Sequence, residues 1–319
     1  MRRNARSHIG RLRLATVGLA IFLAADVALA VVALRPPELG PSERTAASGT
    51  GTPVSTSSLG LSVSSAPAQP QGPAPLTRMI VAVDKHRAWL ASVGTCADGG
   101  GLVQASSDGG RTWSVGSAPA RAIGRVQPLG NGRGFAYAAA RDCQLVELTT
   151  DDDGRSWSRP KRVEEAWTRL VSDSHVVVTP RAGASRPCGG GEVVDLARAT
   201  ASQAAALCAD GTIRRTLDGG VKWSDAGAVP GALTIASREE NGSTATYTAG
   251  PALGCAGIAI IKVAPAAPPL STVACLSSTA AAAAGTISLS VARQAGWLAV
   301  GAQTWVSNAD LNSWKRPAS

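Results

Sequence analysis

The chain has 319 residues, a formal net charge of +9 at pH 7 and 45% hydrophobic residues. Five of the positive charges form one N-terminal group, which consists of Arg2, Arg3, Arg6, Arg11 and Arg13. The remaining excess is spread thinly, and no basic run is interleaved with aromatic residues, which argues against nucleic-acid binding. The preference for arginine over lysine and the abundance of alanine are typical of a GC-rich bacterial genome.

Residues 14–34 form an almost uninterrupted apolar run of the length that a membrane helix needs. The basic residues 1–13 precede this run and predict a cytoplasmic tip, because positive charge stays on the cytoplasmic side. The run is either a single-pass membrane anchor or a signal peptide cleaved near Ala30. Asp26 would cost about 2.5–3.5 kcal/mol at the centre of a spanning helix, whereas the apolar residues after Ala30 favour the anchor, which we expect. Both interpretations export the remainder of the chain.

Residues 35–76 are rich in Pro, Ser, Thr, Gly and Ala and contain few large apolar side chains. Such a segment cannot bury enough apolar surface to fold by itself. We therefore expect a disordered linker with a reach on the order of 35 Å. It joins the membrane segment to a folded domain at residues 77–319.

One short pattern, Ser/Thr-x-Asp-x-Gly-x-Thr-Trp, organises the folded part. It occurs at residues 106–113, at 150–157 with Ser156 in the Thr position and at 216–223 with Lys222 there, and a decayed copy lies at residues 307–314. The Asp can accept backbone N–H groups of its own turn, the Gly supplies a positive φ, and the Trp packs between sheets. The residues that carry the pattern are Ser106, Asp108, Gly110, Thr112, Trp113, Thr150, Asp152, Gly154, Ser156, Trp157, Thr216, Asp218, Gly220, Trp223, Ser307, Ser313 and Trp314.

This pattern closely resembles the Asp-box, or BNR, repeat of β-propellers, a family that includes sialidases, assembly factors and other non-catalytic binding proteins. The resemblance implies that each repeat is a turn between the last two strands of a blade. It also implies that the repeats lie on the face away from the active site, so their expected role is structural. We expect an all-β propeller of about six four-stranded blades, and a non-catalytic member of the group.

Short β-rich runs separated by Gly, Asn, Asp and Pro begin after Arg78 and support this fold. Six runs are predicted to be second strands of blades, near residues 91, 137, 177, 206, 246 and 299. Residues 192–196 are predicted to be a third strand. The interval from 177 to 206 is short for a blade, so a count of five or seven stays open.

Six cysteines in an exported chain favour disulfides, although six admit fifteen connectivities. Five of them follow a predicted second strand and so share one rim of the propeller. Cys255 follows Cys188 by 67 residues and Cys275 follows Cys208 by the same interval, as if one bridged unit had been duplicated. We predict the bridges Cys96–Cys143, Cys188–Cys208 and Cys255–Cys275. No Cys-x-x-Cys pair is present and the histidines are far apart, so neither a metal nor a cofactor is expected.

The cysteines would brace the face opposite the repeats, on which sialidase-like propellers bind their substrate. Loops that are bridged there would be pre-organised for a ligand. The candidate ligand residues on these loops and interblade links are Arg121, Arg141, Asp142, Arg162, Trp167, Arg181 and Arg186.

A sialidase needs an arginine cluster, a Tyr nucleophile with a Glu partner and an acidic proton donor. The only tyrosines are Tyr137 and Tyr247, and both lie in predicted strands. The Arg-Ile-Pro motif that introduces the first arginine of those enzymes is absent from the domain start, where Arg78 is followed by Met79. We therefore expect a non-enzymatic binding or scaffold module at the cell envelope, with a protein or glycan ligand. The alternative is a sialidase-like glycoside hydrolase.

Overall fold

The computed structural model describes residues 73–116, 119–163, 165–240, 242–263, 270–278 and 283–318. The predicted cytoplasmic tip, membrane segment and almost all of the predicted linker lie outside these residues. Within the described ranges, no helix has the length and apolar character that crossing a bilayer requires. The described residues form the folded domain, which begins slightly earlier than predicted because Leu76 is buried in it.

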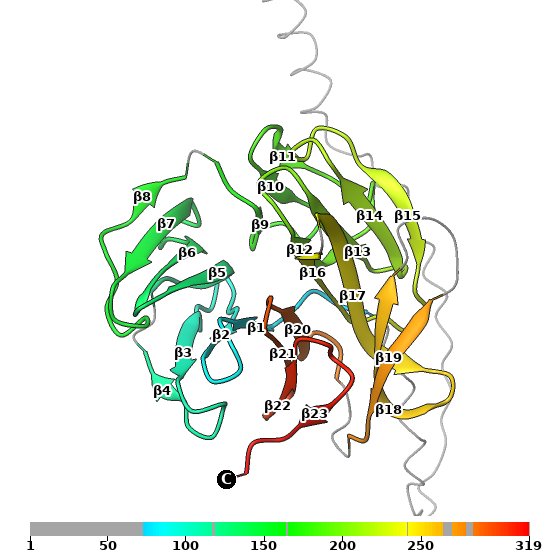
Figure 1. The fold of residues 1–319 in the computed structure, drawn as a ribbon. Helices are drawn as coiled ribbons and strands as arrows, with labels where there is room; N and C mark the ends of the chain where they lie inside the picture. Colours follow the sequence, from blue (N-terminus) through cyan, green and yellow to red (C-terminus); the bar gives the residue numbers. More distant parts are fainter. Residues whose placement is uncertain are drawn as a thin grey trace, which may run out of the picture. The chain divides into compact units, whose positions relative to one another are not determined.

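Twenty-three strands form six antiparallel sheets, arranged as the blades of a β-propeller (Figure 1). In chain order the blades are β1 (Arg78–Ala82), β2 (Ala88–Ser92), β3 (Leu102–Ser106), β4 (Ser114–Val115); β5 (Ala122–Gly130), β6 (Arg133–Ala139), β7 (Leu145–Thr150), β8 (Lys161–Arg162); β9 (Thr168–Arg169), β10 (Val177–Thr179), β11 (Gly183–Ser185); β12 (Val193–Arg198), β13 (Ala204–Cys208), β14 (Thr212–Thr216), β15 (Ser224–Ala228); β16 (Thr234–Glu240), β17 (Ser243–Ala252), β18 (Cys255–Val263), β19 (Ser271–Leu276); and β20 (Ile287–Val291), β21 (Ala295–Val300), β22 (Gln303–Asn308), β23 (Trp314–Lys315). The prediction of an all-β propeller with six blades is confirmed.

The first strand of each blade faces the axis of the propeller. These inner strands contact one another in a closed circle, from β1 through β5, β9, β12, β16 and β20 back to β1. The second strands lie between neighbouring blades and are buried along almost their whole length, as in β2, β13 and β21. The outermost strands β4, β8 and β23 have two residues each and are largely exposed. Burial on both faces explains why second strands read as continuous apolar runs in the sequence.

The third blade differs from the prediction. Residues 192–196 were expected to be a third strand, but β12 is the first strand of the fourth blade, and the third blade has only three strands. Its third strand, β11, consists of Gly183, Ala184 and Ser185, a sequence too short and too polar to be recognised as a strand. The short interval between the second strands near 177 and 206 therefore reflects one incomplete blade.

We call residues 106–113, 150–157, 216–223 and 307–314 the box turns. In the first, Thr112 donates to the Asp108 carboxylate from its backbone N–H at 3.0 Å and from its hydroxyl at 2.7 Å. The hydroxyl of Ser106 donates to the same carboxylate at 2.9 Å and accepts the Gly110 N–H at 2.9 Å. Gly110 has a φ of 87°, as its place in the turn predicted. The Asp thus holds its own turn closed.

The other box turns keep this arrangement to different degrees. The second repeats it in full around Asp152, whereas in the third Lys222 donates to Asp218 from its backbone only. In the decayed fourth copy, Ser307 donates to the carbonyl of Ser313 at 2.6 Å, and Leu311 adopts a φ of 61°. The fourth turn is therefore closed without a carboxylate.

The tryptophans of three box turns pack across the gap to the preceding blade. Trp157 packs edge-on against Trp89 at 6.0 Å between ring centroids, and Trp113 packs in the same way against Trp297 at 6.1 Å. Trp223 packs against Trp167 at 6.2 Å. Such pairs contribute about 0.5–1.5 kcal/mol beyond the burial of their area. Each of these box turns therefore ties its own blade to the one before it.

The ring closes between the first and sixth blades without a shared strand. The buried N–H of Ile80 donates to the Ser288 hydroxyl at 3.0 Å, and the N–H of Ala82 donates to the Ser290 hydroxyl at 3.0 Å. The indole N–H of Trp297 donates to the carbonyl of Asp84 at 2.7 Å. Side chains on one inner strand thus satisfy backbone groups on the next.

The three predicted disulfides are present: Cys96–Cys143, Cys188–Cys208 and Cys255–Cys275. All three lie on the face opposite the box turns, which we call the cysteine face; the other is the box-turn face. The first bridge joins the second-to-third-strand loops of two neighbouring blades, and the third lies within the fifth blade. The cysteine face is therefore braced covalently.

Acid should weaken the box turns. The hydroxyl and N–H of Ser156 and the hydroxyl of Thr150 lower the pKa of Asp152 to about 2, below its usual value of 3.8. A lowered folded-state pKa means that this stabilisation is present above about pH 4 and is lost as the pH falls towards 2. Asp152→Asn should lower the melting temperature at neutral pH and flatten its decline between pH 4 and 2. The exposed neighbour provides the control, Asp151→Asn, whose melting profile should follow the wild type; equal profiles for both variants would contradict the role of Asp152.

The ring closure should depend on Ser288, which is 2% exposed. Ser288→Ala leaves the buried N–H of Ile80 without its acceptor and should destabilise the protein by about 1–3 kcal/mol. Urea unfolding would show this as a lower midpoint with an unchanged slope. Ser107→Ala, on an exposed turn, should leave the midpoint where it is.

Candidate functional site

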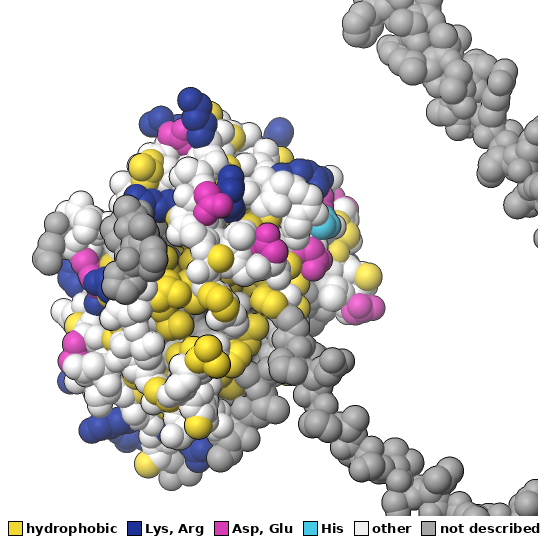
Figure 2. All heavy atoms as spheres, turned by 90° about the vertical axis from the view of Figure 1, so that its right-hand side faces the viewer, with side chains coloured by type: hydrophobic (Ala, Val, Ile, Leu, Met, Phe, Trp, Pro, Cys, Tyr) yellow, Lys and Arg dark blue, Asp and Glu magenta, His cyan; other side chains and the backbone are white. Residues whose placement is uncertain are grey.

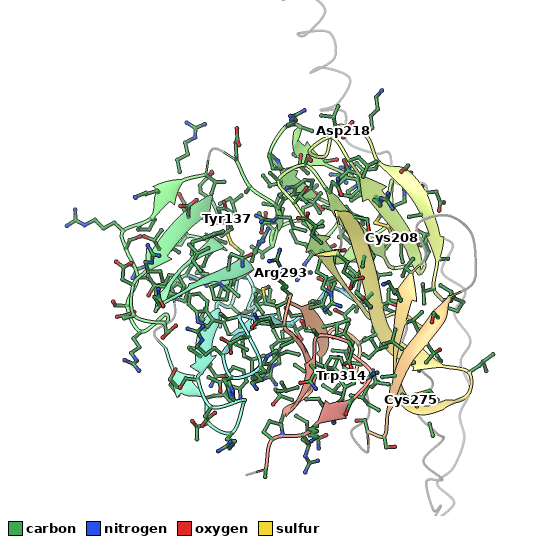
Figure 3. The ribbon with its side chains drawn as sticks, in the orientation of Figure 1. Tyr137, Cys208, Asp218, Cys275, Arg293 and Trp314 are labelled. Atoms are coloured by element: carbon green, nitrogen blue, oxygen red, sulfur yellow. A yellow bond between two sulfur atoms is a disulfide. The ribbon has the colours of Figure 1, made fainter. Side chains whose placement is uncertain are left out.

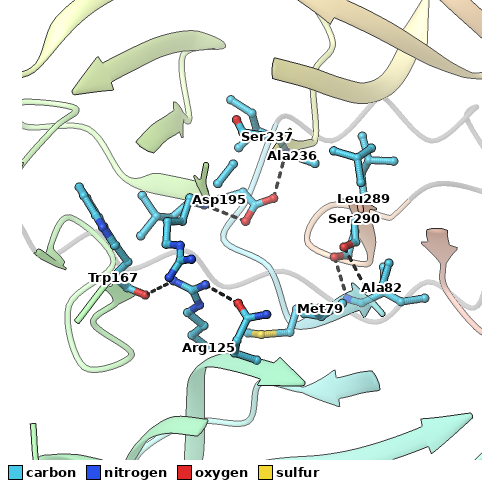
Figure 4. A pocket seen from close by; sticks show the side chains of 18 of the residues that line it. Met79, Ala82, Arg125, Trp167, Asp195, Ala236, Ser237, Leu289 and Ser290 are labelled. Carbon is cyan, nitrogen blue, oxygen red and sulfur yellow. Dashed lines mark hydrogen bonds between the residues drawn. The ribbon is translucent and has the colours of Figure 1, made fainter. Parts of the chain in front are cut away.

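The inner strands enclose a cavity of about 370 Å³ on the axis of the propeller (Figure 4). Its walls come from β1, β5, β12, β16 and β20, together with residues 167–169. Met79, Val126 and Leu289 adjoin the cavity but are buried in the cores between the blades, whereas Gln127 and Ser237 are partly exposed. The cavity is large enough for a small ligand or for one end group of a larger one.

The incoming chain closes this channel on the cysteine face. Leu76 is 4% exposed, and its N–H donates to the carbonyl of Val194 at 3.1 Å. Its own carbonyl accepts a hydrogen bond from Arg169 at 3.1 Å. Leu76 and Arg169 line both the channel and a separate hollow on the cysteine face. Among the described residues, Leu76 therefore closes the channel on the cysteine face, and the channel opens on the box-turn face.

Five arginines line the channel against two carboxylates. The arginines are Arg125, Arg169, Arg198, Arg238 and Arg293, and the carboxylates are Asp195 and Glu239. The sequence analysis did not single out any of them. A hint was available, because Arg125, Arg198 and Arg238 all lie in or at the end of the strand that opens a blade. Recognising this required the correct blade boundaries, which the incomplete third blade obscured.

A buried pair forms the floor of the cavity. Asp195 is 8% exposed and accepts hydrogen bonds from the Thr234 hydroxyl at 2.6 Å and from the Ile235 N–H at 3.0 Å. Burial raises the pKa of Asp195, and the charge of Arg169 and these hydrogen bonds oppose that shift. Asp195 is thus held by Thr234 and the backbone, Arg169 is held by the carbonyl of Leu76, and their charges act on each other, so these two residues are structural.

Arg125 lies above this floor and is held by neutral groups only. It donates to the carbonyl of Trp167 at 3.0 Å and to the side-chain oxygen of Gln127 at 2.6 Å (Figure 4). Burial, and next the like charge of Arg198, lower the pKa of Arg125 to about 10. Arg125 is therefore still charged at neutral pH, with its guanidinium plane fixed and its charge uncompensated.

The mouth of the channel carries three further arginines. Arg238 is paired with Glu240 at 2.6 Å and donates to the carbonyl of Ala292 at 3.1 Å. Arg198 and Arg293 are exposed, and their side chains make no hydrogen bond or ion pair with any residue of the described ranges. Arg293 lies near the axis of the ring in Figure 3. Two cations at the mouth are thus free to meet a ligand.

A second hollow adjoins the mouth and shares Arg238, Glu239 and Arg293 with it. In it the Tyr247 hydroxyl donates to Glu240 at 2.5 Å, and the Lys262 ammonium donates to the other oxygen of Glu240 at 2.8 Å. Partial burial raises the pKa of Glu240, but hydrogen bonds from Lys262, Tyr247 and Arg238 outweigh it and lower the pKa to about 2. Burial and Glu240 raise the pKa of Tyr247. The sequence analysis missed this Tyr–Glu pair, which the register of the β16–β17 hairpin creates.

The candidate ligand residues from the sequence do not form one site. Arg121, Arg141 and Asp142 share a hollow on the cysteine face, where Arg121 donates to the carbonyls of Cys96 and Ala97. The other four lie apart from them: Arg162 is exposed on the outer strand β8, Trp167 lines the channel, Arg186 pairs with Asp173 at 3.0 Å, and Arg181 bonds to Gly219 of a box turn. Arg181 is therefore on the box-turn face, contrary to its expected place.

The surface outside the channel is mixed in character. On the face shown in Figure 2, Lys and Arg side chains are scattered around the edge, and hydrophobic side chains gather in the middle. No group of three or more His, Cys, Asp or Glu residues able to hold a metal ion occurs in the part of the chain that the structure describes. The arginine-lined channel is thus the most distinctive chemical feature of the domain.

No protein-family model and no curated protein matches the sequence. Solved structures that resemble it include YCF48 bound to a D1 peptide, with 15% identity, a TM-score of 0.40 and coverage of 76% of this chain and 82% of that one. A lectin of Aleuria aurantia in complex with α-methyl-L-fucoside has 12% identity, a TM-score of 0.42 and coverage of 76% and 93%. A Trypanosoma rangeli sialidase has 12% identity, a TM-score of 0.41 and coverage of 76% and 53%.

The network around Glu240 should contribute to stability. Glu240→Gln leaves Arg238 and Lys262 without the carboxylate between them and should destabilise the protein by about 1–2 kcal/mol, since the group is partly exposed. Because the folded-state pKa of Glu240 is lowered, the wild-type advantage should be present above about pH 4.5 and shrink as the pH falls towards 2. The control is Glu239→Gln, at an exposed position; equal unfolding midpoints for the two variants would contradict the network.

Proposed function

We propose that this chain is an exported, membrane-anchored β-propeller that binds a partner at the cell envelope without chemical turnover. The single mouth of the axial channel on the box-turn face is its binding site. One observation carries this proposal: the only described opening of the channel is rimmed by Arg198 and Arg293, which have no carboxylate partner among the described residues. Exposed, uncompensated charge at the end of a preformed cavity is typical of a binding site.

The direction from which the chain enters supports this choice of face. The chain reaches β1 through residues 75–77 on the cysteine face, where Leu76 bonds to Val194 and Arg169. Residues 75–77 therefore lie at the opposite end of the channel from Arg198 and Arg293. This proposal moves the ligand from the cysteine face, where the sequence placed it, to the box-turn face.

The chemistry of the mouth supports binding over hydrolysis. Glycoside hydrolysis through a covalent intermediate needs a poised nucleophile and a proton donor on opposite sides of the scissile bond. The raised pKa of Tyr247 keeps its hydroxyl protonated, and Glu240 is already engaged by two cations. Neither group is poised to start the reaction. The Tyr247–Glu240 bond is nevertheless the one observation that favours the second candidate, a sialidase-like hydrolase.

The experiment compares tagged full-length chains in native envelopes after crosslinking and capture. The wild type should retain a stoichiometric protein or glycan, and Arg198→Ala/Arg293→Ala should lose most of it, because two of the mouth charges are gone. Arg141→Ala/Arg162→Ala removes the same charge elsewhere and should capture as the wild type does. Equal capture by both double variants would refute the mouth as the binding site.

A turnover assay addresses the second candidate. The purified full-length chain should not release the fluorophore of a fluorogenic sialoside. Release by the wild type that disappears in Tyr247→Phe, with folding intact, would overturn the non-enzymatic proposal.

A further inference from the structure

We propose that the blind axial channel is a carboxylate-binding pocket, in which Arg198 and Arg293 receive the ligand at the mouth and Arg125 holds its carboxylate inside. This inference rests on the site assigned under the proposed function and names the chemistry that the site takes. The ligand is a carboxylate that is not carried on a sugar ring, either that of a free small acid or that of the end group of a chain.

Cations outnumber carboxylates in the lining of the pocket. Arg238 is paired with Glu240 at 2.6 Å, and the charge of Asp195 acts on Arg169. Arg125, Arg198 and Arg293 then face only Glu239 in the lining. Like charges in an enclosed, partly dehydrated cavity repel more strongly than in water. A bound anion reduces this repulsion, and this makes the binding of an anion favourable.

The geometry of Arg125 suits a carboxylate. A guanidinium presents its N–H groups as a planar fork that matches the two oxygens of a carboxylate. The carbonyl of Trp167 and the side chain of Gln127 fix the plane of Arg125 and use only two of its five N–H donors. Because both acceptors are neutral, the fork is oriented without being neutralised. An oriented, uncompensated fork loses little entropy when it binds.

The shape and lining of the channel narrow the class of ligand. Because Leu76 closes the far end, a polymer cannot thread through, and only a small molecule or an end group fits. The one aromatic in the lining, Trp167, is 3% exposed and offers no open face on which a sugar ring could stack. A guanidinium fork fits a phosphate as well as a carboxylate, so direct comparison of the two anions belongs to the test. Met79, Val126 and Leu289 are 8%, 1% and 5% exposed, so the lining offers little apolar surface to a ligand.

The test is a titration of the purified full-length chain in detergent with glutarate, with neutral glutaramide as the matched probe. Calorimetry should show glutarate binding that weakens with added salt, and glutarate should raise the melting temperature. Arg198→Ala/Arg293→Ala should weaken glutarate binding at least tenfold, and Arg141→Ala/Arg162→Ala should leave it unchanged. Arg125→Lys keeps the charge but removes the fork, and should also weaken it. Glu239→Gln should tighten it, because a carboxylate that lines the channel beside the arginines is removed.

Parallel arms identify the source and the class of the anion. Tighter binding of a peptide with a free C-terminal Glu than of its amidated form places the carboxylate on a chain end and supports the proposal. Tighter binding of glucuronate than of glutarate would place it on a sugar and overturn the proposal. Equal binding of glutaramide, tighter binding of inorganic phosphate, or no glutarate binding up to roughly 10 mM would overturn it. The purified system tests the carboxylate chemistry alone. Loss of envelope capture in Arg198→Ala/Arg293→Ala without any glutarate binding would leave the mouth as a binding site and refute only the carboxylate.

Discussion

The structure depends on how six separate blades are held in a ring. No strand is shared between the first and last blades, so closure rests on contacts between blades: hydroxyls on β20 that accept the N–H groups of β1, and box-turn tryptophans that pack on the blade before. The carboxylates of Asp108 and Asp152 matter for the same reason. They close the turns that position Trp113 and Trp157, and these two tryptophans pack on the preceding blade.

The axial pocket follows from this closure. Every lining arginine comes from, or directly follows, the inner strand of a different blade, so their separation is set by ring geometry and not by one loop. Glu240 pairs with Arg238 and the charge of Asp195 acts on Arg169, whereas Arg125, Arg198 and Arg293 have no ion pair among the described residues. The contacts between blades offset the repulsion among these arginines. The site therefore lies on the inner strands and does not depend on the loops that the disulfides bridge.

The sequence predicted the fold well because its signals are local. A Ser, an Asp and a Gly within one turn, and a Trp directly after it, are enough to specify a box turn, and a fixed offset between cysteines was enough to pair them correctly. The third blade failed because β11 has only three small or polar residues. The site failed for a different reason: Arg125 and Arg198 are far apart in sequence, and only the closed ring makes them neighbours. The Tyr247–Glu240 pair likewise depends on a hairpin register that composition does not reveal.

Leu76 gives the boundary of the domain a chemical meaning. Leu76 lies between the predicted linker and the first strand. Its backbone hydrogen bonds to Val194 and Arg169 hold it at the closed end of the channel. A shortened protein that began at Arg78 would keep every described strand and every disulfide. Its channel would be open at both ends, because Leu76 would no longer close the cysteine face. Wherever a linker is trimmed or a fusion is joined, the cut must therefore respect the cavity as well as the secondary structure.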